Sequence, residues 1–419
     1  MVTSHFQKQT LKNGLRLILV PNHTLPSVSS MVLIGAGSRY ENKNNSGISH
    51  FAEHMFFKGT KKRPDLITLA KELDSIGAVF NAGTSLEMTN YYIKSAKAHL
   101  EKSLDVLSDI LINSKFEEGE IEKEKGVITE EINMIHDEPR KYLAFVYCNL
   151  LYGDTPMGWD IAGTKESINS FKRETFIDYL NNLYQAQNAV LVIAGSFEEK
   201  EAKEMAEKGF LKMSNKSTQS FLPQIESQTK PATKISFRET DQTHLALGFR
   251  SFSRFDPDRY ALEVLDAIFG GGMSSRLFEE AREKRSLCYY VYSDTNFFHD
   301  VGTFSAFAGV ATNRLPEAVK VILSEFHRLA DVEIPEEEIK KAKEYVKGHF
   351  ILTLEDTMNT AGFYGEQEIL EGKIETPEEV IAKIDAVSSG DLSRVAKRVV
   401  KENNLNLAVI GPVKDQNLL

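Results

Sequence analysis

The chain has 419 residues and a mass of 47.1 kDa, which exceeds a typical domain of roughly 100–200 residues and predicts two or three domains. Its 50 basic and 60 acidic residues give a net charge of −10, which argues against nucleic acid or an anionic membrane as the main partner. With 42% hydrophobic and 26% charged residues, the composition is that of a folded protein with a large core, not of a disordered chain.

The sequence shows no targeting or membrane segment. Its first fifteen residues have neither the apolar stretch of a secretory signal nor the arginine-rich composition of a transit peptide. The apolar runs have the length of strands, far below the roughly 18 residues that cross a membrane. Two cysteines, Cys148 and Cys288, do not make a disulfide framework. We therefore expect a cytoplasmic protein that does not associate with membranes.

Taken in chain order, the hydrophobic periodicity predicts strands and helices in both halves. The first half contains expected strands Leu15–Val20, Met31–Gly35, Asn90–Lys94 and Ala189–Ile193, and expected helices Ile48–Lys58, Leu66–Ser75, Leu100–Asn113 and Glu118–Ile135. The second half contains expected strands Leu245–Phe249, Thr303–Ala308 and Leu405–Val409, and expected helices Tyr260–Phe269, Leu315–Ala330 and Glu336–Leu352. Strands followed by helix pairs predict an α+β fold, with helices on one face of a mainly antiparallel sheet.

The two halves repeat one another. The run Leu191–Gly195 recurs as Leu407–Gly411, 216 residues later, and Glu101–Ile110 matches Glu317–Phe326 at the same offset. A polar segment with two prolines lies between the halves and is typical of a linker. We therefore predict two homologous domains, 1–212 and 234–419, joined by a linker over 213–233.

The segment between Ser46 and Gly59 carries the clearest chemical pattern. It predicts a helix with Ser46 as N-cap and Gly59 just past its end. At about 100° per residue, His50, Glu53 and His54 share one face of that helix. Two histidines four residues apart can bind one Zn²⁺, and a glutamate beside them can act as general base toward water. This HxxEH pattern is the inverted form of the HExxH zinc-protease motif; the alternative is a pair of solvated surface histidines.

A third metal ligand is expected on the helix Glu118–Ile135. Seven residues are almost two helical turns, so Glu124 and Glu131 lie on the same side, at the border of the apolar stripe. A carboxylate turned toward a core is costly unless it is paired or binds a metal. Glu131 as ligand, with Glu124 as its supporting neighbour, would remove that cost. The alternative is a solvated acidic helix face.

Five longer segments carry a family resemblance. They are SGISHFAEHMFFKGT (Ser46–Thr60), GAVFNAGTSLEMTNYY (Gly77–Tyr92), EKEKGVITEEINMIHDEP (Glu122–Pro139), PMGWDIAGT (Pro156–Thr164) and FGGGMSSRLFEEAREKRSLCYYVYS (Phe269–Ser293). With these segments the chain resembles the pitrilysin (insulinase) family of zinc metallopeptidases, and within it the short bacterial members similar to the mitochondrial processing peptidase. The resemblance spans both halves.

The resemblance assigns roles to the acidic and histidine residues of the first half. It implies that His50, His54 and Glu131 bind Zn²⁺. It makes Glu53 the catalytic base that activates the zinc-bound water, and Glu124 a supporting residue of the site. It further implies that Asn81 and Ala82, in the strand over 81–85, contact an extended peptide substrate by strand addition. For these two residues the alternative is a polar turn that enters an edge strand.

The second half lacks the metal ligands, since its counterpart of the HxxEH helix, Tyr260–Phe269, contains no histidine. The resemblance implies that Arg282 and Tyr289 of this half hold the substrate and stabilise the developing oxyanion. Without it, they would be a solvated helix residue and an amphipathic strand residue. Ser286 and Cys288 stand where relatives usually carry smaller residues, which affects the expected packing near Tyr289.

The combined expectation is a two-domain, clamshell-like zinc endopeptidase that cleaves peptides or unfolded segments in a cleft between its domains. One chain carries both the metal motif and the Arg–Tyr pair, which favours a self-sufficient enzyme and a homodimer. Two alternatives remain: an inactive scaffold, like the peptidase-derived core subunits of a respiratory complex, and one subunit of a hetero-oligomeric processing peptidase.

Overall fold

The computed structural model of the chain describes residues 5–414 and 418–419 and divides into two compact units. The first unit comprises the chain up to Ile132, together with Asp160–Leu222 and Ile351–Pro377. The second comprises Asn133–Trp159, Pro223–Phe350 and the chain from Glu378. Within the described residues, none of the helices combines the length and the apolar character that crossing a membrane requires.

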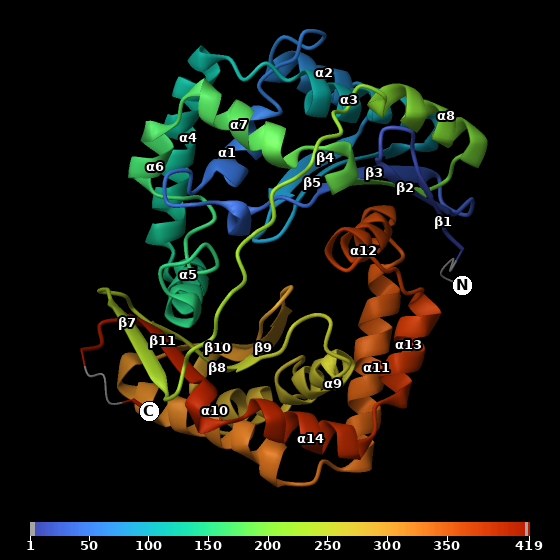
Figure 1. The fold of residues 1–419 in the computed structure, drawn as a ribbon. Helices are drawn as coiled ribbons and strands as arrows, with labels where there is room; N and C mark the ends of the chain where they lie inside the picture. Colours follow the sequence, from blue (N-terminus) through green and yellow to red (C-terminus); the bar gives the residue numbers. More distant parts are fainter. Residues whose placement is uncertain (1–4, 415–417) are drawn as a thin grey trace. The chain divides into compact units, whose positions relative to one another are not determined.

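Both units are built from strands and helices (Figure 1). The strands are β1 (Gln7–Thr10), β2 (Arg16–Pro21), β3 (Ser27–Ile34), β4 (Val79–Thr84), β5 (Thr89–Ala96), β6 (Ala189–Gly195), β7 (Ala232–Phe237), β8 (Thr243–Ser251), β9 (Cys288–Phe297), β10 (Gly302–Val310) and β11 (Leu405–Gly411). The α-helices are α1 (Ile48–Met55), α2 (Leu66–Asp74), α3 (Leu100–Asn113), α4 (Glu118–Asp137), α5 (Pro139–Tyr152), α6 (Lys165–Ser170), α7 (Arg173–Leu183), α8 (Glu199–Phe210), α9 (Arg259–Phe269), α10 (Leu315–Asp331), α11 (Glu336–Thr353), α12 (Thr357–Leu370), α13 (Pro377–Ala386) and α14 (Ser389–Val399).

The sheet of the first unit has the order β1-β2-β6-β3-β5-β4 and is antiparallel except for the β2–β6 pair. Its central strands are apolar on both faces. In β3, Val28, Val32 and Ile34 pack into the larger core with the helices of this unit. Met31 and Leu33 point to the opposite face, where they pack with residues of α12. Burial on both faces explains why β2, β6 and the second half of β3 are continuous apolar runs instead of alternating sequences.

The sheet of the second unit repeats this topology with the order β7-β11-β8-β10-β9. Its β7–β11 pair is parallel, as β2–β6 is, and the other pairs are antiparallel. The repeated runs of the sequence, Leu191–Gly195 and Leu407–Gly411, lie in β6 and β11, which hold the same place in the two sheets. The predicted fold class, α+β with two homologous domains, is therefore confirmed.

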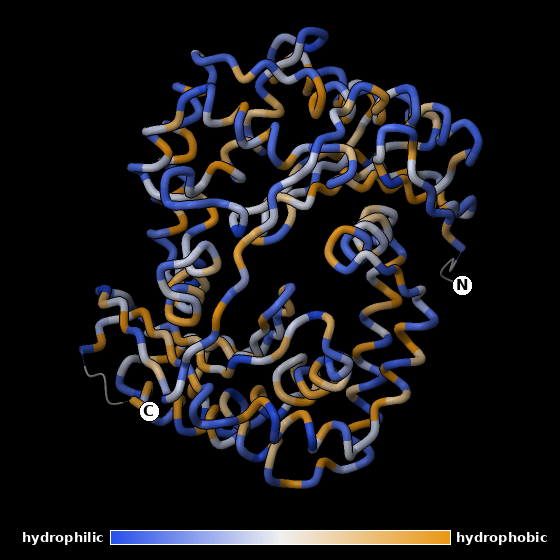
Figure 2. The backbone as a smooth tube through the Cα atoms, in the orientation of Figure 1, coloured by the Kyte–Doolittle hydropathy of each residue, from blue (hydrophilic) through white to orange (hydrophobic). Residues whose placement is uncertain are grey.

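Each unit contains one helix from the other half of the sequence. Helix α12 packs on β3 and β6 of the first unit, and α5 packs on β7, β8 and β11 of the second. Most helices mix apolar and polar residues along their length, as elements with one packed face do (Figure 2). One of the places where the chain passes from the first unit to the second is between Leu222 and Pro223, inside the predicted linker. The predicted domain boundaries follow the duplication in the sequence and stay a prediction.

Candidate metal centre

Helix α1, which carries the HxxEH motif, begins differently from the prediction. Gly47 is its N-cap, with a φ of 91°, and no side chain caps the helix from that position. The carboxylate of Glu41 does this instead, because it accepts hydrogen bonds from the backbone N–H groups of Gly47 and Ser49 at 2.8 and 2.9 Å. The predicted N-cap, Ser46, was wrong, since the left-handed conformation of Gly47 turns the chain one residue later.

The packed face of α1 fixes the direction of its other face. The helix ends at Met55, three residues before the predicted end, and the following residues form turns. The apolar residues of the helix and its C-cap are buried, namely Ile48, Phe51, Ala52, Met55 and Phe56. Phe51 packs edge-on against Phe176 of α7. Because this face is packed in the core, the opposite face, which carries His50 and His54, points in a fixed direction.

The two histidines of α1 and Glu131 of α4 bring three ligand atoms together. The Nε2 atoms of His50 and His54 lie 3.3 Å apart. Glu131 places Oε1 3.6 Å from His50 Nε2 and Oε2 3.6 Å from His54 Nε2. Among the described residues these three side chains form a group able to hold a metal ion. Tetrahedral ligands at about 2.0–2.1 Å from Zn²⁺ lie about 3.3–3.4 Å apart, so the donor set fits zinc.

The outer nitrogen of His54 is held by a second glutamate. His54 Nδ1 lies 2.8 Å from Oε1 of Glu124, and the other oxygen of that carboxylate lies 2.5 Å from Nζ of Lys58. Only 4% of the Glu124 side chain is exposed. Donation of the Nδ1 proton to Glu124 fixes the tautomer of His54 and leaves the lone pair of Nε2 directed at the metal position.

The charges around the centre keep its carboxylates ionised. The hydrogen bond from His50 lowers the pKa of Glu131 below its usual value. Burial raises the pKa of Glu124, but the hydrogen bonds from His54 and Lys58 outweigh this, and the pKa of Glu124 is lowered. Burial by itself lowers the pKa of His50, yet the hydrogen bond and charge of Glu131 raise it overall. The cluster therefore carries negative charge that a cation would neutralise.

Glu53 lies on α1 between the two histidines and contacts strand β4. Its Oε2 accepts a hydrogen bond from the hydroxyl of Thr84 at the end of that strand. Strand β4 is at the edge of its sheet, where Asn81 is exposed and its side-chain oxygen accepts from the N–H of Ala82 at 2.9 Å. The edge position is the one that strand addition needs. Substrate contact by Asn81 and Ala82 stays a prediction.

Arg282 and Tyr289 belong to the second unit. Arg282 lies in a short π-helix, Phe278–Glu283, with its guanidinium 4.9 Å from the ring centre of Phe278. Tyr289 begins the exposed side of β9, and 67% of the residue is exposed. Both residues line a pocket of about 460 Å³. Ser286 between them has a φ of 48°, a conformation that glycine adopts at lower cost.

Sequence reasoning missed three residues that support the site. Lys58 could have been found, because it follows His50 and His54 at the same four-residue spacing. Glu41 and Thr84 left no such signal. Glu41 reaches the start of α1 from a preceding loop, and Thr84 reaches Glu53 from strand β4, so both contacts depend on tertiary structure.

Comparison with known protein families gives two matches along the chain. The family described as Insulinase (Peptidase family M16) matches residues 16–165, which include the donor set of the centre. The family described as Peptidase M16 inactive domain matches residues 170–346, which include Arg282 and Tyr289. The two matches follow each other in the same order as the two halves of the sequence.

Full-length relatives and solved structures agree with these matches. The chain is 36% identical to "Uncharacterized zinc protease YmxG" of Bacillus subtilis over 406 residues, 97% of this chain and 98% of that protein. It is 35% identical to an uncharacterized zinc protease of Rickettsia bellii, over 97% and 98% of the two chains. A protease from Helicobacter pylori matches in structure with a TM-score of 0.92, 27% identity and coverage of 97% and 99%. A chain of complex III2 from Candida albicans shares the fold, with a TM-score of 0.86 at 18% identity and coverage of 99% and 97%. The chain belongs to peptidase family M16, the insulinase family.

Proposed function

We propose that this protein is a zinc-dependent endopeptidase that hydrolyses peptides or unfolded segments. The observation that carries the proposal is the convergence of His50, His54 and Glu131, with ligand atoms 3.3–3.6 Å apart and Glu53 on the same helix. Relatives named zinc proteases, similar over nearly the whole chain, support it.

In the proposed mechanism, His50, His54 and Glu131 would hold the zinc ion. When bound there, zinc supplies a Lewis acid that polarises the scissile carbonyl and increases the acidity of water. Glu53 accepts a proton from the attacking water and delivers it to the nitrogen of the leaving amine. The hydroxyl of Thr84 holds one oxygen of Glu53, which limits the rotation of that carboxylate. Glu124 holds the imidazole of His54 in the ligating tautomer.

The substrate contacts are also part of the proposal. The unpaired edge of β4 offers backbone groups near Asn81 and Ala82 to an extended peptide. Arg282 and Tyr289 carry a donor group each, and we propose that they hold the substrate and stabilise the oxyanion. Their exposure in the second unit supports this role, because an exposed tyrosine and a pocket-lining arginine are accessible to a ligand.

Two alternatives to this proposal remain, and the donor set argues against the first of them. An inactive scaffold has no need of two histidines and a carboxylate at metal-ligating distances, so their convergence favours the enzyme. A subunit of a hetero-oligomeric peptidase would cleave peptides only with an unlike partner. The cytoplasmic location and the homodimer stay predictions, and size-exclusion of the pure active protein tests the latter.

The replacement Glu53→Gln tests the proposed base. It keeps the size of the side chain and removes its ability to accept a proton, so we expect turnover of a mixed peptide library to fall by at least about 100-fold. Zinc content stays at about one ion per chain in both proteins, because Glu53 is not a ligand. Metal analysis and peptide mass spectrometry of the pure protein measure both quantities. Undiminished cleavage by Glu53→Gln would rule out the assigned base, and a wild-type protein that is inert and free of zinc would contradict the proposed function.

A further inference from the structure

The loop that follows α1 leads to α2 and also contacts the segment that precedes α4. In this loop, residues 56–65, the carbonyl of Phe56 accepts a hydrogen bond from the hydroxyl of Ser114 at 3.1 Å. The carbonyl of Gly59 accepts from the N–H of Lys115 at 3.1 Å, and Thr60 forms a β-bridge with Ser114. Because Ser114 and Lys115 lie in the short segment between α3 and α4, the end of α1 is joined through this loop to the chain that leads into α4.

Lys58 extends from this loop to the carboxylate behind the metal ligands. Its Nζ lies 2.5 Å from Glu124 Oε2, and the side chains of Lys58 and Glu124 are 19% and 4% exposed. The other oxygen of Glu124 is bound by His54. Both oxygens of the buried carboxylate therefore have a partner, and the one from Lys58 carries a full positive charge. A charge-assisted hydrogen bond of this kind fixes the direction of a carboxylate more strongly than a neutral one.

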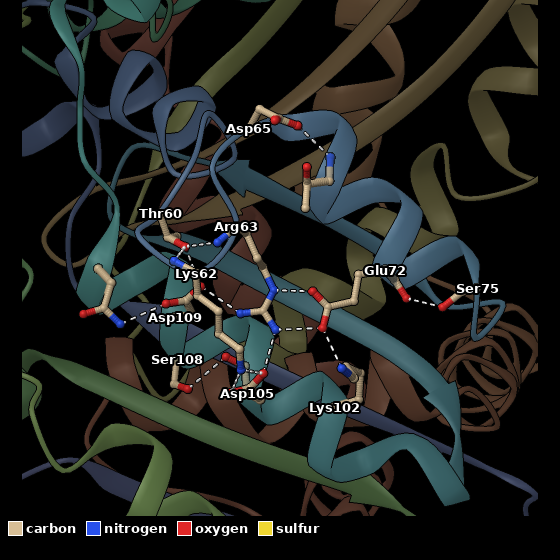
Figure 3. A network of polar contacts seen from close by, with 12 residues as sticks. Thr60, Lys62, Arg63, Asp65, Glu72, Ser75, Lys102, Asp105, Ser108 and Asp109 are labelled. Atoms are coloured by element: carbon tan, nitrogen blue, oxygen red, sulfur yellow. Dashed lines mark hydrogen bonds and ion pairs between the residues drawn. The ribbon is translucent and has the colours of Figure 1, made fainter.

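Arg63 anchors the same loop in the body of the first unit (Figure 3). Only 1% of its side chain is exposed. Its guanidinium donates to both oxygens of Glu72 at 2.6 and 2.9 Å, to Asp105 at 2.6 Å and to Asp109 at 2.7 Å. The hydroxyl of Thr60 donates to the same oxygen of Asp109 at 2.6 Å. The buried guanidinium is thus paired in several directions, which holds the loop in one conformation.

We propose that Lys58 is a positioning residue of the metal centre, which acts through Glu124 on His54, and that the Arg63 cluster fixes the loop from which Lys58 extends. The inference rests on the proposed zinc site. Removal of the ammonium group leaves one partner for the two oxygens of Glu124. The carboxylate then loses its fixed direction, and His54 loses the fixed acceptor for its Nδ1 proton. Outer partners of this kind typically change metal affinity by about 10–100-fold.

The experiment compares zinc dissociation constants of metal-free wild type and variants by competition with a chromophoric chelator. Lys58→Met keeps the length and removes the charge, and we expect its dissociation constant to rise about 10–100-fold. Lys58→Arg keeps the charge and restores most of the affinity. Lys123→Met is the matched control, because Lys123 pairs with Glu120 on the exposed side of α4. It leaves the affinity unchanged.

A double replacement tests whether Lys58 acts through Glu124. Glu124→Gln weakens zinc binding by itself, and in that background Lys58→Met adds no further loss, because the carboxylate it would hold is absent. A role of Lys58 in folding alone would instead lower the unfolding free energy of the metal-free protein without this coupling. Where Lys58→Met does not fold, Lys58→Gln, which keeps a hydrogen-bond donor without the charge, takes its place.

Three results overturn the proposal. They are an unchanged zinc dissociation constant in folded Lys58→Met, a loss equal to that of Lys123→Met, and a full additional loss in the Glu124→Gln background. Each of these leaves the zinc site itself intact. Absence of zinc binding in the wild-type protein would instead remove the proposed function.

Discussion

Glu124 and Asp266 both carry buried carboxyl oxygens, but the two residues have different surroundings. Each oxygen of Glu124 has a cationic or imidazole partner, and its pKa is lowered although burial raises it. Asp266 on α9 has an Oδ1 that is buried and has no hydrogen-bond partner among the described residues. Burial raises the pKa of Asp266 to about 7. The pairing of Glu124 supports the proposed centre, and the burial of Asp266 makes stability depend on pH.

The sign of that dependence follows from linkage. The folded pKa of Asp266, about 7, exceeds its ordinary value of 3.8, so the folded protein binds the proton more tightly than the unfolded chain. The contribution to stability is complete below about pH 4 and is lost as the pH rises to 7. We expect Asp266→Asn to raise the free energy of unfolding at pH 8 by up to about 4 kcal/mol and to have little effect at pH 4. Urea unfolding at both pH values measures this difference.

Asp241→Asn is the control for Asp266→Asn, because Asp241 is an exposed residue of the same unit. It changes the net charge equally and leaves the buried site intact. An equal effect of the two variants at pH 8, or no effect of Asp266→Asn, would contradict a raised pKa of Asp266 in the folded protein.

At the scale of elements, several amphipathic segments were predicted well, although α14, which is also strongly amphipathic, was not predicted. Helix α3 has the predicted bounds, and β6, α9 and α10 differ from the prediction by two residues or fewer at either end. Helices α5 and α12 were not predicted. Their buried residues face a sheet made by the other half of the sequence. The hydrophobic periodicity within a segment does not reveal which sheet that segment will cover. The direction of α1 was predicted from its spacing, but its N-cap depends on Glu41 and on the conformation of Gly47.

Gly47→Ala tests the start of α1. A Cβ at this position, where φ is 91°, would lie 2.7 Å from the carbonyl oxygen of Ala162 and 2.8 Å from the Cα of Gly163. We expect the free energy of unfolding to fall by about 1–3 kcal/mol, because the backbone must shift to relieve both the contact and the strain. Urea unfolding of the metal-free protein measures the change.

Gly126→Ala is the matched replacement on the other ligand-bearing helix. Gly126 lies inside α4, where a Cβ meets no atom within 4 Å. The same substitution is expected to raise the unfolding free energy by up to about 1 kcal/mol, since alanine favours a helix interior over glycine. Opposite signs at the two positions support the structure of α1, and a stabilising Gly47→Ala would contradict it.

At the scale of the whole molecule, the sequence contained both the duplication and the proposed metal ligands. His50, His54 and Glu131 could be predicted because helical spacing places each of them on a defined face. The exchange of α5 and α12 between the units could not be predicted from the sequence, because it depends on which sheet faces remain to be covered. Glu41 and Thr84 were missed for a related reason, since each contacts a residue of another element. The central claim, a zinc-dependent peptidase, depends on the donor set that the fold assembles.

Zinc add-back to the metal-free protein tests that claim most directly. A chelator removes the ion, cleavage of an unstructured peptide is followed, and zinc is then titrated into the protein. We expect cleavage to disappear with the chelator and to return in proportion to added zinc until about one equivalent per chain is bound. Full cleavage by the zinc-free protein, or stoichiometric zinc binding without any return of cleavage, would contradict it.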